Sequence, residues 1–154
     1  MPNVVLVQPQ IPPNTGSVAR TCAATRTELH LVGELGFEIS DRYLKRAGLD
    51  YWPYVDWHYH PDWAQFQAHR RQAGGRAVGL SASRGAQNYA HYAFAPNDWL
   101  LFGSETDGLP DAVLAACDTT LYIPIQQPQV RSFNLSVSVA IVLFEAQRQL
   151  GRLA

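Results

Sequence analysis

Short apolar runs alternate with helical segments along most of the chain, and this alternation limits the possible folds more than any other feature. The apolar and β-branched runs predict strands over residues 3–8, 28–32, 55–60, 76–81, 99–103 and 119–125. Between them, helices are predicted over residues 14–25, 40–48, 63–71, 110–117 and 135–150, the first capped by Asn14 or Thr15. The sequence therefore predicts an α/β fold with a largely parallel sheet and helices on both faces. Its 154 residues suit a single domain over residues 1–154.

The last predicted helix is apolar nearly all round in its first half. Its β-branched residues between positions 137 and 142 would also suit a strand, but two signals favour a helix. Asn134 is a good N-cap, and strong helix formers continue from residue 145 to Gly151, which suits the position after a helix end. A helix that is apolar on most sides must be buried on most sides. We therefore expect this helix at the interface of a homodimer.

Net charge, cysteine spacing and the first apolar run limit the kinds of site and partner that the chain can have. The formal net charge is −1, which by itself gives no indication of a nucleic-acid partner, so any RNA contact needs a local patch. The two cysteines, Cys22 and Cys117, lie far apart and indicate neither a zinc site nor a disulfide framework. The apolar run at the start is too short for a signal peptide or a membrane span. We expect a cytoplasmic protein that does not contact a membrane.

Two short patterns that resemble known sites do not support them. His58 and His60 would share one face of a strand, but no third ligand with suitable spacing follows, so we expect no metal site. The G-S-E sequence at Gly103 lacks the G-x-S-x-G spacing of a nucleophile elbow, which excludes a serine hydrolase of that kind.

Three longer motifs lie at the start, in the second half and near the end of the chain. They read P-P-N-T-G-S-V-A-R over residues 12–20, L-L-F-G-S-E-T-D-G-L-P over 100–110 and I-P-I-Q-Q-P-Q-V-R-S-F-N-L-S over 123–136. In this order they resemble the three motifs of the SPOUT class of RNA methyltransferases. With I-P-P-N-T-G near its start and R-A-G-L-D-Y at residues 46–51, the chain is most similar to the tRNA wobble-nucleotide 2′-O-methyltransferases. The resemblance covers the whole chain and is weakest over residues 52–75.

The resemblance implies a fold and a cofactor that spacing alone does not indicate. Spacing predicts an ordinary doubly wound sheet, whereas members of this class tie the C-terminal segment into a deep trefoil knot. The implied cofactor, S-adenosylmethionine, contacts the strand ends at Leu80, Gly103 and Ile123, and Ser132 completes the pocket. Apolar strand ends suit a flat adenine, and Gly103 would let the ligand approach the backbone closely.

The resemblance also implies the catalytic residues Arg20, Asn14, Glu105, Ser132 and Asn134. A guanidinium keeps its proton in proteins, so we expect Arg20 to fix a phosphate or the developing alkoxide and not to act as the base. Glu105 is the expected orienting partner of Arg20, and Asn14 is expected to position the same loop. Ser132 and Asn134 are candidates for holding the ribose or the methionine end of the cofactor.

Basic side chains are the candidates for contacts with RNA phosphates. These are Arg42, Lys45, Arg46 and Arg84, although a solvated face would explain them equally well. Asp107 departs from the pattern, since relatives commonly carry arginine there, and an acidic group repels phosphates.

These features together predict methylation of a tRNA ribose 2′-hydroxyl, at the wobble nucleotide, without a metal ion. A related alternative is methylation of ribosomal RNA. An alternative of a different class is a catalytically silent RNA-binding module that keeps the cofactor pocket; the neutral net charge and Asp107 favour it, and the intact motif residues argue against it.

Overall fold

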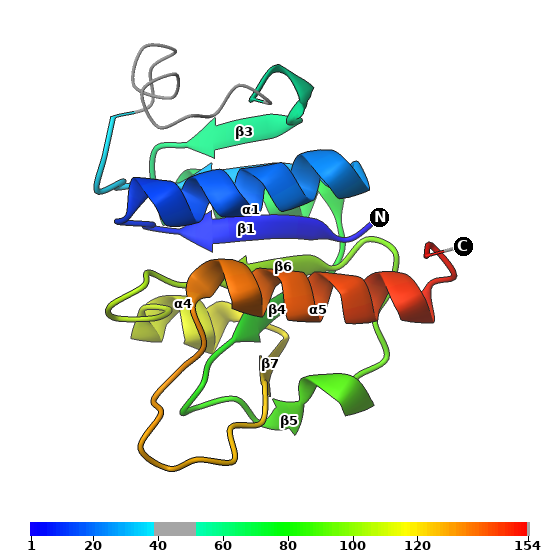
Figure 1. Cartoon of the computed structure of the whole chain (residues 1–154). Helices are drawn as coiled ribbons and strands as arrows, with labels where there is room; N and C mark the ends of the chain where they lie inside the picture. The colour runs from blue at the N-terminus through cyan, green and yellow to red at the C-terminus, as the bar shows by residue number, and fades with distance from the viewer. Residues whose placement is uncertain (39–51, 154) are drawn as a thin grey trace.

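In the part of the chain that the structure describes, seven parallel strands form one sheet through the middle (Figure 1). The computed structural model describes residues 1–38 and 52–153. In sequence order the strands are β1 (Asn3–Val7), β2 (Leu29–Val32), β3 (Trp57–His60), β4 (Ala77–Leu80), β5 (Gln87–Asn88), β6 (Trp99–Phe102) and β7 (Thr119–Tyr122). Every neighbouring pair is parallel. The predicted parallel α/β fold is confirmed.

Helices cover both faces of the sheet. On one face, α1 (Pro12–Thr25) and α5 (Leu135–Gln149) pack over a first core cluster that includes Val4, Leu31 and Val139 (Figure 1). On the other face, α3 (Trp63–Ala73) and α4 (Asp111–Ala116) pack over a second cluster that includes Val5 and Phe66. Two short 3-10 helices, η1 (Trp52–Tyr54) and η2 (Tyr89–His91), lie in the connections.

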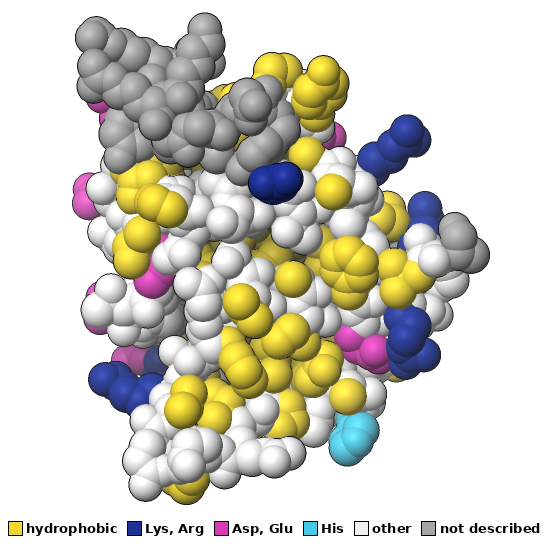
Figure 2. Space-filling model, in the orientation of Figure 1, with side chains coloured by type: hydrophobic (Ala, Val, Ile, Leu, Met, Phe, Trp, Pro, Cys, Tyr) yellow, Lys and Arg dark blue, Asp and Glu magenta, His cyan; other side chains and the backbone are white. Residues whose placement is uncertain are grey.

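Both ends of α5 form as the sequence predicts. The side chain of Asn134 accepts a hydrogen bond from the Ser136 backbone N–H at 2.8 Å, which caps the helix. At the other end, Gly151 adopts a left-handed φ of 71°, and the Arg152 N–H donates to the Gln147 carbonyl at 2.8 Å. One side of α5 remains exposed, with Val137 and Phe144 on it, and hydrophobic side chains gather over this face (Figure 2).

The start of α1 differs from the prediction. The helix begins at Pro12, and its N-cap is Ile11, which makes no side-chain capping bond. Two prolines fit the first positions of a helix because their missing N–H groups have no partner there and their φ angle is already helical. Asn14 therefore lies inside the first turn and does not cap it.

Other differences are small or fall outside the described residues. The short strand β5 lies where the sequence predicts no strand, and all the predicted strands are present with ends within three residues. The predicted helix over residues 40–48 lies outside the described residues. Within the described part of the chain, no helix has the length and apolar character that crossing a membrane requires.

The strand order departs from an ordinary doubly wound sheet. The order is β3-β2-β1-β6-β4-β7-β5. In the doubly wound pattern, the strands on each side of β1 follow one another outward in the order in which they occur in the sequence. Here β6 lies between β1 and β4, and β7 lies between β4 and β5. The direction of chain growth reverses between β1 and β6. Ligands in open α/β sheets bind beside the carboxyl ends of strands at such a reversal.

Candidate functional site

Glu105 joins the carboxyl ends of β1 and β6 at the reversal of strand order. It lies in a tight turn that Ser104 and Gly108 close through two backbone hydrogen bonds, with Gly108 at a left-handed φ of 69°. Its carboxylate accepts hydrogen bonds from the backbone N–H of Gln10 at 3.0 Å and of Ile11 at 2.7 Å. A carboxylate is favoured there because unpaired N–H groups and the positive end of the dipole meet at a helix N-terminus.

Asn14 connects Glu105 to the start of α5. Its side-chain amide donates to Glu105 Oε2 at 3.3 Å, and its carbonyl accepts from Asn134 Nδ2 at 3.2 Å. Asn134 in turn accepts from the Ser136 hydroxyl at 2.6 Å. Three of the predicted catalytic residues, one from each sequence motif, thus form a single hydrogen-bonded network.

Arg20 lies apart from this network within the chain. It is an exposed residue of α1, six residues after Asn14, which corresponds to about 9 Å along the helix axis. In the described part of the structure, Glu105 makes no ion pair with Arg20 and binds Gln10, Ile11 and Asn14 instead. The orienting role of Glu105 towards Arg20 therefore stays a prediction.

The predicted cofactor-binding residues come together at one edge of the sheet. Leu80 ends β4, Gly103 follows β6 and Ile123 follows β7, and these three strands are neighbours in the order β6-β4-β7. Leu80 and Ile123 are partly buried and pack against the first core cluster, so they offer apolar surface at the strand ends. Ser132 is exposed in the loop between β7 and α5. The partly buried apolar side chains of Leu80 and Ile123 suit contact with the flat adenine of S-adenosylmethionine.

The reason given for Gly103 is wrong. A Cβ atom at Gly103 would overlap with the backbone of Gly108 and Leu109, which belong to the same tight turn. Glycine is required there because the chain folds back on itself, and not because a ligand needs the space.

Two of the residues discussed for RNA contact lie near the start of α4. Arg84 forms an ion pair with Asp111 and donates to the Leu109 carbonyl at 3.4 Å. Asp107 is exposed in the turn that carries Glu105, and its backbone N–H donates to Ser104 Oγ at 3.0 Å. The other candidates, Arg42, Lys45 and Arg46, lie outside the described residues.

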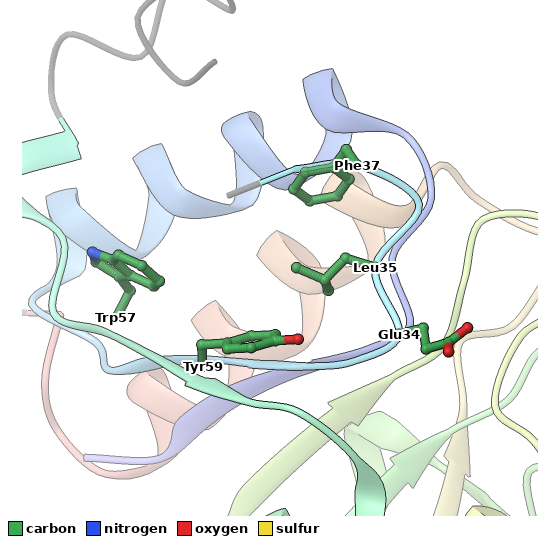
Figure 3. A pocket seen from close by; sticks show the side chains of 5 residues that line it. All are labelled: Glu34, Leu35, Phe37, Trp57 and Tyr59. Carbon is green, nitrogen blue, oxygen red and sulfur yellow. The ribbon is translucent and has the colours of Figure 1, made fainter. Parts of the chain in front are cut away.

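A cavity of about 610 Å³ lies elsewhere, beside the edge strand β3 (Figure 3). Its walls are Glu34, Leu35, Phe37, Trp57 and Tyr59. In Figure 3 the two β3 side chains, Trp57 and Tyr59, lie opposite Leu35 and Phe37. None of the predicted catalytic or cofactor-binding residues lines this cavity, so it is separate from the network at β1 and β6.

The sequence analysis missed a cluster of ligand-type side chains at β2 and β3. Glu28 and His30 lie beside His58, and the three ligand atoms are all within 4.8 Å of one another. Burial, together with the nearby His58, His60 and His69, lowers the pKa of His30 to about 3, so its imidazole is neutral at pH 7. His58 therefore has ligand-type neighbours on the adjacent strand, which the spacing along β3 alone did not indicate.

Comparisons with known proteins give consistent results. The model of the SpoU rRNA Methylase family matches residues 1–144. A relative from Synechocystis sp. is 58% identical over 99% of this chain and 99% of its own. A relative from Burkholderia ambifaria, named tRNA (cytidine(34)-2'-O)-methyltransferase, is 45% identical over 97% of this chain and 96% of its own.

Solved structures match along nearly the whole chain. One, described as giving insights into the 2-OH methylation of C/U34 on tRNA, is 48% identical with a TM-score of 0.90, and covers 98% of this chain and 97% of that one. Another is the SpoU methyltransferase AviRb from Streptomyces viridochromogenes in complex with the cofactor AdoMet. It is 26% identical with a TM-score of 0.83, covering 97% of this chain and 57% of that one.

Proposed function

The chain belongs to the SpoU rRNA methylase family, and on that basis we propose that it methylates the ribose 2′-hydroxyl of nucleotide 34 in tRNA. The observation that carries the proposal is the network of Glu105, Asn14 and Asn134, which joins all three sequence motifs at the reversal of strand order. A protein that had lost catalysis would have no need to keep these three polar side chains hydrogen-bonded to one another. The silent RNA-binding module is therefore the weaker alternative.

Transfer RNA is the better substrate assignment than ribosomal RNA. The family description refers to rRNA, but relatives that match nearly the full length of this chain, at 45% and 42% identity, carry names that specify tRNA cytidine 34. The similar structure at 48% identity also concerns C/U34. Because tRNA is the proposed substrate, we place the reaction in the cytoplasm.

S-adenosylmethionine is the methyl donor, as in two AdoMet-bound methyltransferases of the same fold. We assign its binding to Leu80, Gly103, Ile123 and Ser132, which the strand order β6-β4-β7 and the following loop bring to one edge. The cofactor supplies an electrophilic methyl group for direct displacement by the ribose oxygen. The apolar side chains of Leu80 and Ile123 support the adenine and exclude water from its face.

The chain must then hold the ribose oxygen in line and stabilise its developing negative charge. We assign charge stabilisation to the guanidinium of Arg20, which keeps its proton and lowers the effective pKa of the hydroxyl. Glu105 holds the loop after β1 against the turn after β6. Asn14 bonds to both Glu105 and Asn134, and so fixes Asn134 relative to that turn. Asn134 and Ser132 are then placed to contact the ribose or the methionine end of the cofactor. We assign phosphate contacts to Arg42, Lys45, Arg46 and Arg84.

We also propose that the C-terminal segment forms a trefoil knot. The strand order supports this, because β7 lies between β4 and β5, which precede it in the sequence. The connection after β4 runs close to β7, since a Cβ atom at Gly85 would overlap with the backbone of Leu121 and Tyr122. A knot further requires that the chain leading to β7 passes through the loop that joins β4 and β5.

A homodimer follows from the exposed side of α5. Val137 is 45% exposed and Phe144 is 43% exposed on this helix. Ile11 and Phe133, which are close in sequence to the network residues Asn14 and Asn134, are also exposed. Association would remove this apolar surface from water. In such a dimer Arg20, which lies apart from Glu105 in its own chain, can serve the site of the partner.

Light scattering tests this proposal. It should report a dimer at micromolar concentration for the wild type and Tyr54→Asp, and a monomer for Val137→Asp. A wild-type monomer would overturn the proposal.

The function is tested by incubating the protein with S-adenosylmethionine carrying a labelled methyl group and with purified tRNA or ribosomal RNA. Nuclease digestion and mass spectrometry then locate the modified nucleotide. We expect label in tRNA, as a 2′-O-methylated nucleotide at position 34. Label confined to ribosomal RNA, or cofactor binding without transfer to either RNA, would overturn the assignment.

A further inference from the structure

The neighbouring strands β2 and β3 begin with the same pattern of ligand-type residues. Glu28 and His30 form an E-x-H pattern, and Asp56 and His58 form a D-x-H pattern. The parallel register pairs His30 with His58, which places Glu28 beside Asp56. Side chains two residues apart on a strand point to the same face, and adjacent strands lie about 4.8 Å apart. Four metal-ligand side chains therefore meet at the amino ends of two strands.

Three distances within this cluster are close to the spacing of ligand atoms around a four-coordinate metal ion. Glu28 Oε1 lies 3.3 Å from His30 Nε2 and 3.3 Å from His58 Nε2. Asp56 Oδ1 lies 3.0 Å from His58 Nε2. Ligand atoms about 2.0–2.1 Å from a tetrahedral zinc ion stand roughly 3.3 Å from one another. Small movements of exposed side chains would therefore complete the coordination.

His58 Nε2 has an unusual environment for a nitrogen without a bound ion. The atom is buried, and it has no hydrogen-bond partner although two carboxylate oxygens lie within 3.3 Å. A buried polar nitrogen without a partner costs free energy, and two carboxylates brought together repel each other. A cation between them would bind the nitrogen lone pair and neutralise both carboxylates.

The surroundings hold His30 in the orientation that a ligand needs. His30 is fully buried, and its Nδ1 lies 2.9 Å from His60 Nε2, so the opposite nitrogen points towards Glu28. The rings of His30 and His58 stack with centroids 4.6 Å apart, and Trp99 packs edge-on against His30. Metal-binding histidines commonly donate their second N–H to a neighbouring acceptor, which fixes the tautomer and the ring.

We propose that Glu28, His30 and His58, with Asp56 as the fourth ligand, form a zinc site that ties the edge strand β3 to β2. Two imidazole nitrogens with carboxylate oxygens suit Zn²⁺ better than Mg²⁺ or Ca²⁺, which prefer oxygen ligands alone. The site lies at the amino ends of the strands, whereas the methyl-transfer residues lie at the carboxyl ends. The ion would therefore stabilise the fold and take no part in methyl transfer.

The test uses full-length protein without a histidine tag, freed of metal with a chelator and then dialysed. Zn²⁺ is titrated in competition with a chromophoric chelator, and Co²⁺ is titrated separately to record its visible absorption. We expect one ion per chain, intense Co²⁺ bands typical of four-coordinate sites, and a higher unfolding temperature with Zn²⁺. Glu28→Gln and His58→Gln alter partly exposed side chains and should weaken binding by about 100-fold or more.

His91→Gln is the matched control, because His91 is an exposed histidine of η2, far from β2 in the sheet order. This variant should bind Zn²⁺ as tightly as the wild type and show the same rise in unfolding temperature. The proposal is overturned if the wild type binds no stoichiometric Zn²⁺ at tens of micromolar. It is equally overturned if the Glu28 and His58 variants bind as tightly as the His91 variant.

Discussion

Replacing Glu105 by glutamine tests whether its carboxylate holds the site together. The two carboxylate oxygens accept three hydrogen bonds, from Gln10 N, Ile11 N and Asn14 Nδ2. Glutamine keeps one acceptor oxygen and replaces the other with an NH₂ donor. If the oxygen stays with Ile11 and Asn14, the NH₂ group faces the Gln10 N–H, and that bond is lost together with the negative charge.

A hydrogen bond to a charged group contributes about 1.5–3 kcal/mol to stability. The lower end applies here, because the backbone donors are exposed and water can replace the lost acceptor. We therefore expect Glu105→Gln to cost about 1.5 kcal/mol. For a protein of this length, 1 kcal/mol corresponds to roughly 2–4 °C in melting temperature, so the expected fall is about 3–6 °C.

The assay is thermal unfolding followed by circular dichroism, with Asp107→Asn as the control. Asp107 lies in the same turn, and among the described residues its carboxylate accepts no hydrogen bond, so this variant removes a charge without removing a contact. Its melting temperature should stay within about 1 °C of the wild type, as is usual for surface changes. Equal melting temperatures for the Glu105 and Asp107 variants would refute the role assigned to Glu105.

Three further variants test other residues of the site. Arg20→Lys keeps the charge but loses the planar fork, so single-turnover methyl transfer should fall on the order of a hundredfold while calorimetry gives an unchanged cofactor affinity. Recovery of its rate as the pH approaches the lysine pKa would instead favour a base at this position. Gly103→Ala should lower the melting temperature by about 5 °C or more, because the new Cβ overlaps with the Gly108 backbone; an unchanged value would contradict that contact. Asp107→Arg should steepen the salt dependence of tRNA binding by about one unit of log–log slope, and an unchanged slope would place Asp107 away from the RNA.

Local chemistry made the elements of the fold predictable. Asn134 and Asp62 cap α5 and α3 with their own side chains, and Gly151 ends α5 in a left-handed conformation. Each of these signals acts within one turn of helix, so the sequence alone contains it. The order of the strands was not predictable from spacing, because it depends on which distant segments pair.

The start of α1 shows how a distant partner changes a local prediction. A proline pair suits either a rigid loop or the first turn of a helix, and Asn14 suits either a cap or the turn itself. In the structure the prolines and Asn14 form the first turn of α1, where Asn14 bonds to Glu105, ninety-one residues later. Sequence motifs indicated that Asn14, Glu105 and Asn134 share a site, but the geometry of α1 separates Arg20 from them.

The histidine cluster could not be found from the spacing along one strand. His58 offers one ligand-type side chain on β3, and the other groups of the cluster are Glu28, just before β2, and His30 on β2. Only the parallel register of the two strands brings them together. A repeated pattern of a carboxylate and a histidine two residues apart, at the start of adjacent strands, is the signal that would have indicated the cluster.

The most direct test of methyl transfer to the wobble ribose uses two chemically synthesised forms of one tRNA substrate. One form lacks only the 2′-hydroxyl of nucleotide 34, and the other lacks only the 2′-hydroxyl of nucleotide 32. Single-turnover incorporation of labelled methyl groups should be abolished in the first form and should remain near the unmodified level in the second. Incorporation into the tRNA that lacks the 2′-hydroxyl of nucleotide 34 would contradict the proposed reaction.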